Sequence, residues 1–202
     1  MNYSQNNEQA LILSYFQRRV GNFLDLGAND GKTLSNTYEL SQLGWSGVCV
    51  EPSPLAFERL RALHRQDVQC INVAVGSTTK SITLHQSWEH MGSGDVALLS
   101  TAVDIELARW ATTPTAFEPI EVECLSFPDL LSRCGSNRFN LISMDIEGME
   151  LEVLEQMDLS ALGCEMLLVE VNERDPTPYL RHAKGYGLKL KTRTPENLIL
   201  IR

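Results

Sequence analysis

Long hydrophobic runs and clusters of basic side chains are missing from this 202-residue sequence. The apolar stretches 166–169 and 198–201 are far shorter than the roughly 20 residues of a membrane-spanning helix. With 17 basic against 26 acidic side chains, the formal net charge is -9, which repels phosphate backbones. We therefore expect no membrane span and no nucleic-acid partner, and we expect a small molecule as the ligand.

Paired cysteines and a secretory leader are also lacking. The sequence has five cysteines, none in a C-x-x-C pair: Cys49, Cys70, Cys124, Cys134 and Cys164. The first nine residues are polar and show neither the basic start nor the apolar segment of a signal peptide. The sequence therefore predicts reduced thiols and a cytoplasmic protein, whereas it indicates no particular oligomeric state.

Short β-branched runs alternate with helical patterns along the whole chain, and no repeat or low-complexity linker divides it. Strands are predicted at residues 23–26, 47–50, 68–75, 81–85, 120–125, 139–144, 165–171, 188–191 and 198–201. Helices are predicted at 8–19, around 34–40, and at 54–65, 103–110, 150–157 and 178–186. This alternation predicts an α/β fold with a mostly parallel, doubly wound sheet and a C-terminal antiparallel hairpin.

We interpret residues 1–202 as a single domain. An N-terminal helix lies within residues 1–20, and residues 86–119 form an insertion that lacks a clear period. In open parallel sheets, ligands bind beyond the carboxyl ends of the strands. The polar side chains that follow the predicted strands therefore mark the expected site, with the insertion expected near the acceptor.

The first of these polar stretches is a glycine turn that runs from Asp25 through Gly27 to Gly31. It is one residue too short for a P-loop, although residues 141–145 look like the magnesium-binding strand of such a protein. Asn29 stands where a dinucleotide-binding turn needs its second glycine. The D-x-G-x-x-x-G spacing fits the turn that binds S-adenosylmethionine, and the acidic Asp25 and Asp30 suit a cationic ligand.

A second polar stretch begins at Glu51, about twenty residues after the glycine turn and at the end of the next strand. A carboxylate at this position accepts hydrogen bonds from the two hydroxyls of a ribose. A strand-end glutamate before proline is commonly only a solvated turn residue. The upstream glycine turn favours the ligand-binding role.

The third stretch continues the predicted strand at 139–144 into Asp145-Ile-Glu147-Gly-Met-Glu150. Together with Phe-Leu-Asp-Leu-Gly-Ala-Asn-Asp-Gly and Val-Glu-Pro-Ser-Pro, it closely resembles the FkbM-type family of S-adenosylmethionine-dependent methyltransferases over residues 23–155. The resemblance implies the Rossmann-like class I methyltransferase fold. It also implies methyl transfer, usually to an oxygen of a sugar or another small hydroxylated metabolite.

The resemblance further implies which residues hold the cofactor. The glycine turn would flank the methionine moiety, Glu51 would hold the ribose, and residues 72–74 would lie near the adenine. The residues implied to bind S-adenosylmethionine are Asp25, Gly27, Ala28, Asn29, Gly31, Glu51, Pro52, Ser53, Asn72, Val73, Ala74 and Asp145.

Asp145 and Glu147 are the predicted catalytic residues, because methyl transfer to a hydroxyl needs a group that takes up the acceptor proton. Glu147 is the preferred base. A carboxylate just before a helix also caps free backbone amides, and this structural role for Glu147 stays open. Asp145, Glu170 and Asn172 would offer oxygen ligands to Mg²⁺, so a divalent metal is possible without being assigned.

Two functions other than methyl transfer stay open at this stage. One is a P-loop-like nucleotide hydrolase, which requires a nucleoside triphosphate and Mg²⁺. The other is a non-catalytic module that binds S-adenosylmethionine without turnover. The identity of the acceptor and the methylated atom are not fixed by any motif in the sequence.

Overall fold

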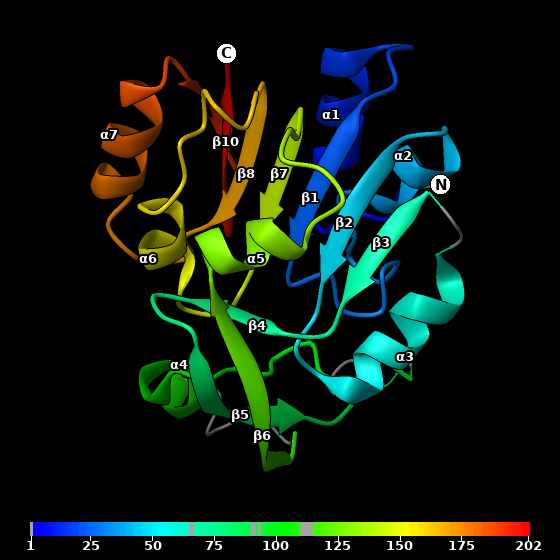
Figure 1. The fold of residues 1–202 in the computed structure, drawn as a ribbon, viewed down its shortest axis with the longest axis vertical. Coiled ribbons are helices and arrows are strands. Elements are labelled where there is room, and N and C mark those ends of the chain that lie inside the picture. Colours follow the sequence, from blue (N-terminus) through cyan, green and yellow to red (C-terminus); the bar gives the residue numbers. More distant parts are fainter. Residues whose placement is uncertain (1, 65–66, 90–91, 93, 110–114) are drawn as a thin grey trace.

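The computed structural model describes residues 2–64, 67–89, 92, 94–109 and 115–202 (Figure 1). Its strands are β1 (Asn22–Leu26), β2 (Ser46–Val50), β3 (Val68–Ile71), β4 (Ala74–Gly76), β5 (Lys80–Ser87), β6 (Phe117–Ser126), β7 (Leu141–Met144), β8 (Met166–Glu170), β9 (Lys189–Arg193) and β10 (Asn197–Ile201). Its helices are α1 (Glu8–Phe16), α2 (Tyr38–Gln42), α3 (Pro54–Leu63), α4 (Asp104–Arg109), α5 (Phe127–Arg133), α6 (Glu150–Leu154) and α7 (Thr177–Gly185).

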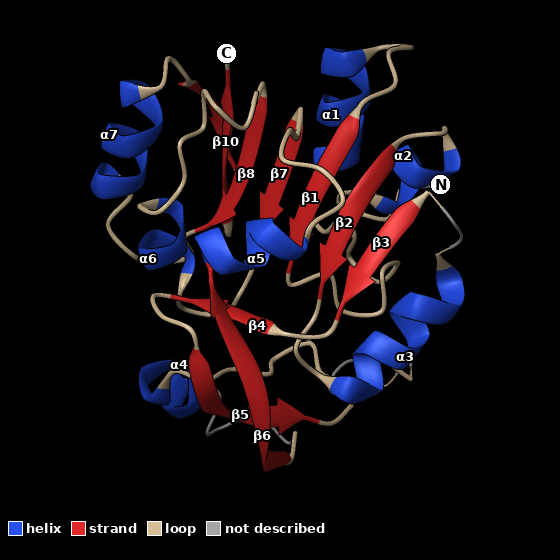
Figure 2. Cartoon of the chain, in the orientation of Figure 1, coloured by secondary structure: helices blue, strands red, loops and turns tan. Residues whose placement is uncertain are grey.

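Seven of the described strands form the main sheet in the order β3-β2-β1-β7-β8-β10-β9. Each neighbouring pair from β3 to β8 is parallel, whereas β10 is antiparallel both to β8 and to β9. The predicted α/β class, the mostly parallel sheet and the terminal hairpin are thereby confirmed. The carboxyl ends of the parallel strands lie along one edge, toward the second, smaller sheet (Figure 2).

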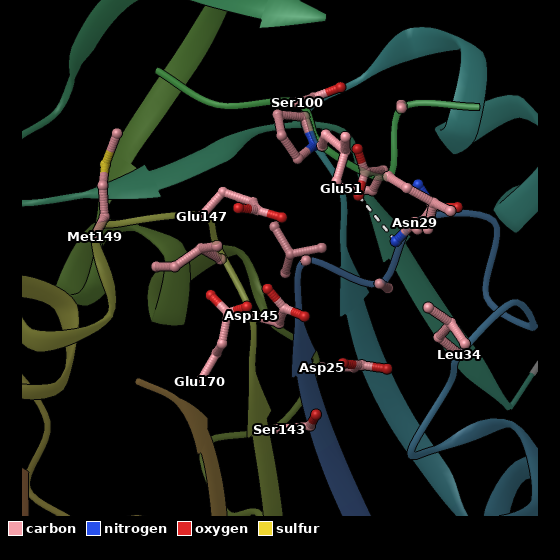
Figure 3. Close-up of a pocket in the computed structure, with 18 of the residues that line it drawn as sticks. Asp25, Asn29, Leu34, Glu51, Ser100, Ser143, Asp145, Glu147, Met149 and Glu170 are labelled. Atoms are coloured by element: carbon pink, nitrogen blue, oxygen red, sulfur yellow. Dashed lines mark hydrogen bonds between the residues drawn. The ribbon is translucent and has the colours of Figure 1, made fainter. Parts of the chain in front are cut away.

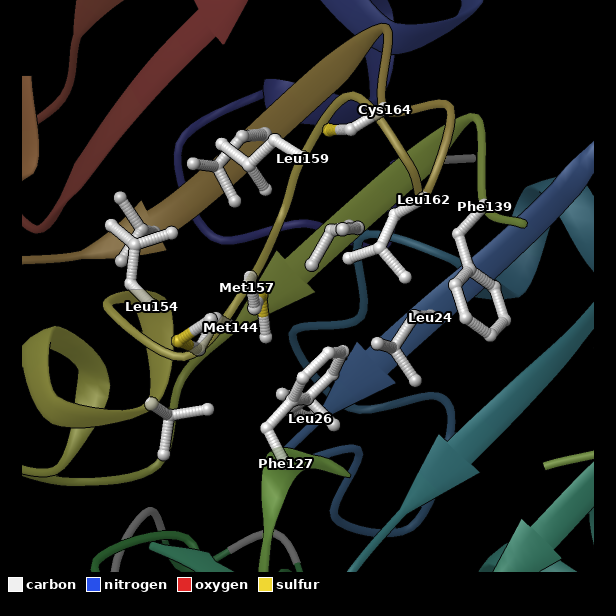
Figure 4. Close-up of a cluster of buried hydrophobic side chains, with 14 of the residues drawn as sticks. Leu24, Leu26, Phe127, Phe139, Met144, Leu154, Met157, Leu159, Leu162 and Cys164 are labelled. Atoms are coloured by element: carbon white, nitrogen blue, oxygen red, sulfur yellow. The ribbon is translucent and has the colours of Figure 1, made fainter. Parts of the chain in front are cut away.

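Helices cover both faces of the main sheet, and the alternation of side chains within each strand explains why. On one face, Leu24 and Leu26 of β1 belong to a buried apolar cluster with Phe127 of α5 and Leu154 of α6 (Figure 4). On the other face, the intervening Phe23 packs in a second cluster with residues of α1, α2 and α3. Strands that are buried on both faces read as continuous apolar runs, as the sequence does here.

The predicted strand at 68–75 is wrong as a single element. The chain breaks between Ile71 and Ala74, so β3 joins the main sheet whereas β4 joins a smaller sheet with the order β4-β6-β5. β4 runs parallel to β6, and β5 pairs antiparallel with β6 along their whole shared length. This small sheet lies beside the carboxyl edge of the main sheet (Figure 1).

Helix α5 was not predicted, although the sequence carries its start signals. Ser126 accepts a hydrogen bond from the backbone N–H of Asp129, and Pro128 occupies the first turn. Helix α1 ends at Phe16, three residues before its predicted end. The predicted helices at 54–65 and 103–110 each end at residues that lie outside the described part of the chain.

The described residues include no helix that is both long enough and apolar enough to cross a lipid bilayer. All five cysteines carry free thiols, and burial raises the pKa of each. Cys164, for example, has its pKa raised to about 12 because its thiol is almost wholly buried. These thiols are small packing groups in the core.

Candidate active site

A cavity of about 480 Å³ opens at the carboxyl edge of the main sheet (Figure 3). Its walls come from the ends of β1, β2, β7 and β8 and from segments of the small sheet and the loop that follows β5. Ten of the predicted site residues line it: Asp25, Gly27, Ala28, Asn29, Glu51, Pro52, Val73, Ala74, Asp145 and Glu147. The structure therefore gathers residues that are up to 122 positions apart around one space.

Three predicted site residues stand behind the wall of the cavity. Ser53 caps α3 and donates its backbone N–H to Glu51, while the Asn72 side chain donates to the Glu51 carbonyl oxygen. Gly31 packs against Leu60 of α3 at a φ of +80°. These residues hold the cavity wall in place without lining it.

The Glu51 carboxylate is held in place by hydrogen bonds to both of its oxygens. It is buried with 4% exposure, and its two oxygens accept backbone N–H groups of Ser53 at 2.8 Å and Asn29 at 2.9 Å. Burial raises the pKa of Glu51 to about 7, and the two hydrogen bonds limit the rise because they stabilise the ionised form. The carboxylate thus couples the end of β2 to the glycine turn after β1.

Asp25 lies on the face of β1 opposite Leu24, beside Ser143 in the paired strand β7. Thr37 donates its hydroxyl to the Asp25 carboxylate at 2.5 Å, and Asn36 donates to the Ser143 hydroxyl at 3.2 Å. Burial raises the pKa of Asp25 to about 6. The segment before α2 therefore orients both polar groups that interrupt the apolar strands.

The turn after β1 brings two loops into close contact. Gly27 has a φ of +83°, and a Cβ atom there would stand 1.6 Å from the backbone oxygen of Asp145. The Asp145 backbone N–H in turn donates a hydrogen bond to the carbonyl oxygen of Leu26 at 2.9 Å. Glycine is required here by the protein's own packing. A larger residue would displace the Asp145 loop before it met any ligand.

Asp30 does not take the ligand-facing role that the sequence suggested for it. Its carboxylate accepts the backbone N–H groups of Lys32 and Thr33 and the Thr33 hydroxyl, and it does not line the cavity. Of the two turn carboxylates, Asp25 alone lines the cavity.

Part of the 86–119 insertion lies over the glycine turn. Asn29 donates its side-chain amide to the Val96 carbonyl at 2.8 Å, and residues 97–100 line the cavity with Ala102. The Asn29 side-chain oxygen is buried and has no hydrogen-bond partner among the described residues. Residues 90–91, 93 and 110–114 of the insertion are outside the described part of the chain.

Three carboxylates converge on the opposite side of the cavity from Glu51: Asp145, Glu147 and Glu170 (Figure 3). Burial and the neighbouring acids raise the pKa of Asp145 and of Glu147 well above the usual range. Burial, with Asp145 and Glu150 nearby, raises the pKa of Glu170 to about 9. The Asp145 side chain is exposed to the cavity, and the protein and acids crowded around it disfavour its ionised form.

The turn before α6 is capped by Glu150 instead of Glu147. One Glu150 oxygen accepts the backbone N–H groups of Ile146 at 2.9 Å and Gly148 at 3.1 Å. Glu147 adopts a φ of +51°, and its Oε2 atom is buried with no hydrogen-bond partner among the described residues. The capping role left open for Glu147 is therefore filled by its neighbour, and the Glu147 carboxylate is left for the cavity.

The negative charge of Glu150 is compensated by Arg174, which no sequence pattern had predicted as part of the site. Arg174 contacts Glu150 at 3.1 Å and also pairs with Glu106 of α4, which pairs with Arg109 at 3.2 Å. Burial raises the pKa of Glu150, and Arg174 opposes that rise. Because Arg174 and Glu106 are distant in sequence from Glu150, no local pattern signals this network.

Metal-ligating geometry occurs at the same acidic side. Within the described residues, Asp145, Glu150 and Glu170 offer carboxylate oxygens that all lie within 4.8 Å of one another. Asn172, the third ligand considered from the sequence, lines the cavity close by, and its Nδ2 atom is buried without a partner in the described part of the chain. Oxygen-only ligands of this kind suit hard cations such as Mg²⁺.

Several lining residues had no signal strong enough to select them. Leu84 and Leu99 add apolar surface to the cavity wall, while Gln5 and Glu196 come from the two ends of the chain. The side-chain amide of Asn6 donates a hydrogen bond to the Glu196 carboxylate at 2.5 Å, which brings the N-terminal segment to the mouth of the cavity. Ser143 was detectable, because it is the polar interruption of an otherwise apolar strand.

Comparison with known proteins assigns the chain to a family. The model of the methyltransferase FkbM domain matches residues 25–183, which include the whole of the site except its terminal segments. The chain belongs to the FkbM methyltransferase domain family. The resemblance seen in the sequence motifs is thereby confirmed. A search of curated proteins gives no match.

Solved structures share the fold of this FkbM domain. Methyltransferase FkbM from Methylobacillus flagellatus KT superposes with a TM-score of 0.56 at 17% identity over 90% of this chain and 44% of that one. Monomeric WbdD gives a TM-score of 0.55 at 12% identity over 97% and 41%. A TehB-like SAM-dependent methyltransferase from Corynebacterium glutamicum ATCC 13032 Kitasato gives 0.50 at 12% identity over 96% and 85%. This chain therefore spans less than half of the first two proteins.

Proposed function

We propose that this protein transfers the methyl group of S-adenosylmethionine to an oxygen of a small hydroxylated acceptor, such as a sugar. The observation that carries the proposal is the pairing of Glu51 with the glycine turn on one side of the cavity and three carboxylates on the other. The FkbM domain family supports methyl transfer, and the choice of oxygen and acceptor class is our inference.

The cavity fits S-adenosylmethionine in size and chemistry. Its volume of about 480 Å³ falls in the range of roughly 300–1,000 Å³ that is usual for small-molecule sites. Glu51 offers an acceptor for ribose hydroxyls, and Val73, Leu84 and Leu99 offer apolar surface for a purine. Asp25 supplies negative charge for an amino group. The buried, unpartnered Asn29 oxygen gives a further acceptor beside Glu51.

When bound, S-adenosylmethionine supplies a methyl group on a positively charged sulfur, so little further activation of that carbon is needed. The protein's task is to align the acceptor and remove its proton. Glu147 would take the hydroxyl proton as the acceptor oxygen bonds to the methyl carbon and the carbon–sulfur bond breaks. The bonding electrons remain on the sulfur, and the product is the neutral thioether S-adenosylhomocysteine.

Glu147 is suited to this role by its surroundings. Burial and the nearby Glu170 raise the pKa of Glu147, which strengthens the ionised carboxylate as a base. Its Oε2 atom has no protein partner in the described residues, so accepting a proton breaks no existing hydrogen bond. The carbonyl oxygen of Glu147 accepts the Thr101 hydroxyl at 2.8 Å, which fixes the turn.

The P-loop alternative is poorly supported by the local geometry. Helix α2 begins at Tyr38, seven residues after Gly31, so the glycine turn does not present helix N-terminal amides to a phosphate. Asp25 and Glu51 line the same cavity and would repel a triphosphate. A binding module without turnover shares the cofactor side of the cavity and differs only in lacking an acceptor reaction.

Calorimetry followed by a transfer assay tests the proposal. The wild-type protein is titrated with S-adenosylhomocysteine and, separately, with MgATP, and we expect binding of the first alone. The protein is then incubated with methyl-labelled S-adenosylmethionine and a panel of sugars and other hydroxylated metabolites. Labelled product from a hydroxylated acceptor supports the proposal. Binding of MgATP in place of S-adenosylhomocysteine would contradict it.

A further inference from the structure

The acidic side of the cavity gathers carboxyl groups that no described ion pair joins directly to a cation. Arg174 and Arg109 lie near enough to lower pKa values there, but their described ion pairs are with Glu106 and Glu150. Glu170 is 7% exposed, yet its Oε2 atom is buried with no hydrogen-bond partner in the described residues. Its carboxylate is turned toward those of Asp145 and Glu147 (Figure 3). Buried carboxylates in proteins are normally paired or coordinate a metal. Here the protein provides no cation directly to Asp145 or Glu170 in any described contact.

Arg174 does not fill this gap, because its contacts lie on Glu150 and Glu106. Glu150 also accepts two backbone N–H groups, so both of its oxygens are already in use. Of the three carboxylates whose oxygens lie within 4.8 Å of one another, Asp145 and Glu170 are therefore the two with free coordinating capacity. Glu150 adds negative charge near both of them.

Asn172 gives a separate sign that a ligand belongs here. Its side chain is 7% exposed and lines the cavity, and its proximity lowers the pKa of the adjoining Glu170 carboxyl group. No described acceptor, however, meets its Nδ2 atom with the distance and angle of a full hydrogen bond. Rotation of the amide by 180° exchanges its nitrogen and oxygen positions and would set an oxygen beside Glu170. An orphaned NH₂ group becomes a ligand oxygen in that orientation.

We propose that Asp145 and Glu170, with the side-chain oxygen of Asn172, bind one Mg²⁺ at the acidic side of this cavity. Among the described lining residues there is no histidine or cysteine, which disfavours zinc and copper. Mg²⁺ commonly binds through one or two carboxylates and keeps several waters, and the open cavity leaves room for them. Resting on the proposed function, the role of the ion would be to orient the acceptor hydroxyl next to Glu147 and make it easier to deprotonate.

The site is tested by titrating the cofactor-free full chain with Mn²⁺, a spectroscopic substitute for Mg²⁺, and measuring free Mn²⁺ by electron paramagnetic resonance. We expect one Mn²⁺ per chain, displaced by Mg²⁺. Glu170→Gln should weaken this binding at least tenfold. Glu173→Gln is the matched control, because Glu173 lies in the same loop, lines the same cavity and is exposed, and it should change the affinity less than twofold.

A second measurement uses the wild-type protein alone, so it does not depend on whether a variant folds. In an amide-resolved NMR spectrum of the wild type, sub-stoichiometric Mn²⁺ should broaden signals around residues 145–147 and 170–172 first. Failure of the wild type to bind Mn²⁺, equal effects of the two substitutions, or broadening centred elsewhere would overturn the proposal. Binding of a primary amine such as glucosamine without any Mn²⁺ binding would also overturn it, because the carboxylates would then serve a cationic acceptor.

S-Adenosylhomocysteine is titrated into the same three proteins to separate this proposal from the proposed function. If the wild type binds Mn²⁺ but not S-adenosylhomocysteine, the metal site stands and the methyltransferase function fails. If Glu170→Gln keeps its affinity for S-adenosylhomocysteine while losing Mn²⁺, both proposals are supported. Normal binding of S-adenosylhomocysteine with no bound Mn²⁺ removes the metal alone.

Discussion

The carboxylates on the two sides of the cavity differ in their hydrogen bonding. Glu51 has both oxygens bonded to backbone N–H groups and stands ready in the free protein. Across the cavity, Glu147 and Glu170 each keep a buried oxygen that has no partner in the described residues. Both sides raise carboxyl pKa values by burial. Backbone N–H groups offset the rise at Glu51, whereas neighbouring acids add to it at Glu147 and Glu170.

This difference in hydrogen bonding suits the two sides to different functions. A carboxylate fixed by rigid backbone amides is preorganised to bind the same group each time, which suits a constant cofactor. Crowded acids without partners are costly in the free protein and become favourable when a proton or a cation arrives. We therefore propose that the first side binds S-adenosylmethionine and that the second side serves proton and acceptor chemistry.

The largest expected effect tests the second side. Glu147→Gln keeps the size of the side chain and removes the base, so kcat should fall by about 10²- to 10⁴-fold. Affinity for S-adenosylmethionine should change little, because Glu51 and the glycine turn are untouched. The measurement needs the acceptor found in the labelled-transfer screen. A variant with full kcat would move the base role to Asp145 or to a metal-bound oxygen.

Gly27→Ala tests the contact that joins the two sides. The new Cβ would lie 1.6 Å from the Asp145 backbone oxygen at a φ of +83°, so the loop must shift. We expect unfolding stability to fall by about 3 kcal/mol, with weaker cofactor binding as a consequence. Urea unfolding measures it, with Gly44→Ala as the control: the φ there is similar and no atom lies within 4 Å. If both variants lose the same unfolding free energy, the loss comes from the positive φ alone and the contact with Asp145 adds nothing.

Glu51→Gln tests the first side. It leaves one backbone N–H bonded but removes the charge that strengthens the ribose hydrogen bonds. Affinity for S-adenosylmethionine should fall by about 2 kcal/mol, or roughly 30-fold. Glu118→Gln, on the exposed part of β6, makes the same chemical change away from the cavity. If calorimetry finds the two variants alike, Glu51 does not hold the cofactor.

The pH dependence of binding is the smallest effect. The pKa of Glu51 is about 7 and that of Asp25 about 6 in the free protein, both raised by burial. Because a cationic ligand prefers the ionised carboxylates, affinity must fall as pH drops through these values. Between pH 8 and pH 6 we expect about 20-fold weaker binding, of which about tenfold comes from Glu51. A flat profile would mean that neither carboxylate faces the ligand.

The fold was largely predictable from the sequence because parallel strands leave a strong local pattern. The predicted strands at 23–26 and 47–50 lie within β1 and β2, and the predicted strand at 139–144 contains β7. The pattern failed at residues 68–75, where the chain leaves one sheet for another without a strong break in hydropathy. Only tertiary pairing with β6 decides that point.

The site was predictable where its residues follow strands, as at Asp145. It was not predictable where partners meet only in three dimensions. Arg174 belongs to the site through Glu150. Gln5 lines the cavity because a hydrogen bond from Asn197 to Glu8 holds the start of α1 beside the start of β10. The division of roles between Glu147 and Glu150 also depends on backbone geometry, since both lie in one acidic motif and differ in which amides they reach.

A structure of the protein with S-adenosylhomocysteine bound would decide whether the two sides of the cavity have the roles that we propose. We expect ribose hydroxyls on the Glu51 carboxylate, the amino group toward Asp25, and the sulfur facing the space between Asp145 and Glu147. This expectation would be contradicted by a ligand whose ribose lies away from Glu51, or whose sulfur is screened from the three carboxylates so that no acceptor oxygen can approach along the line of the departing bond.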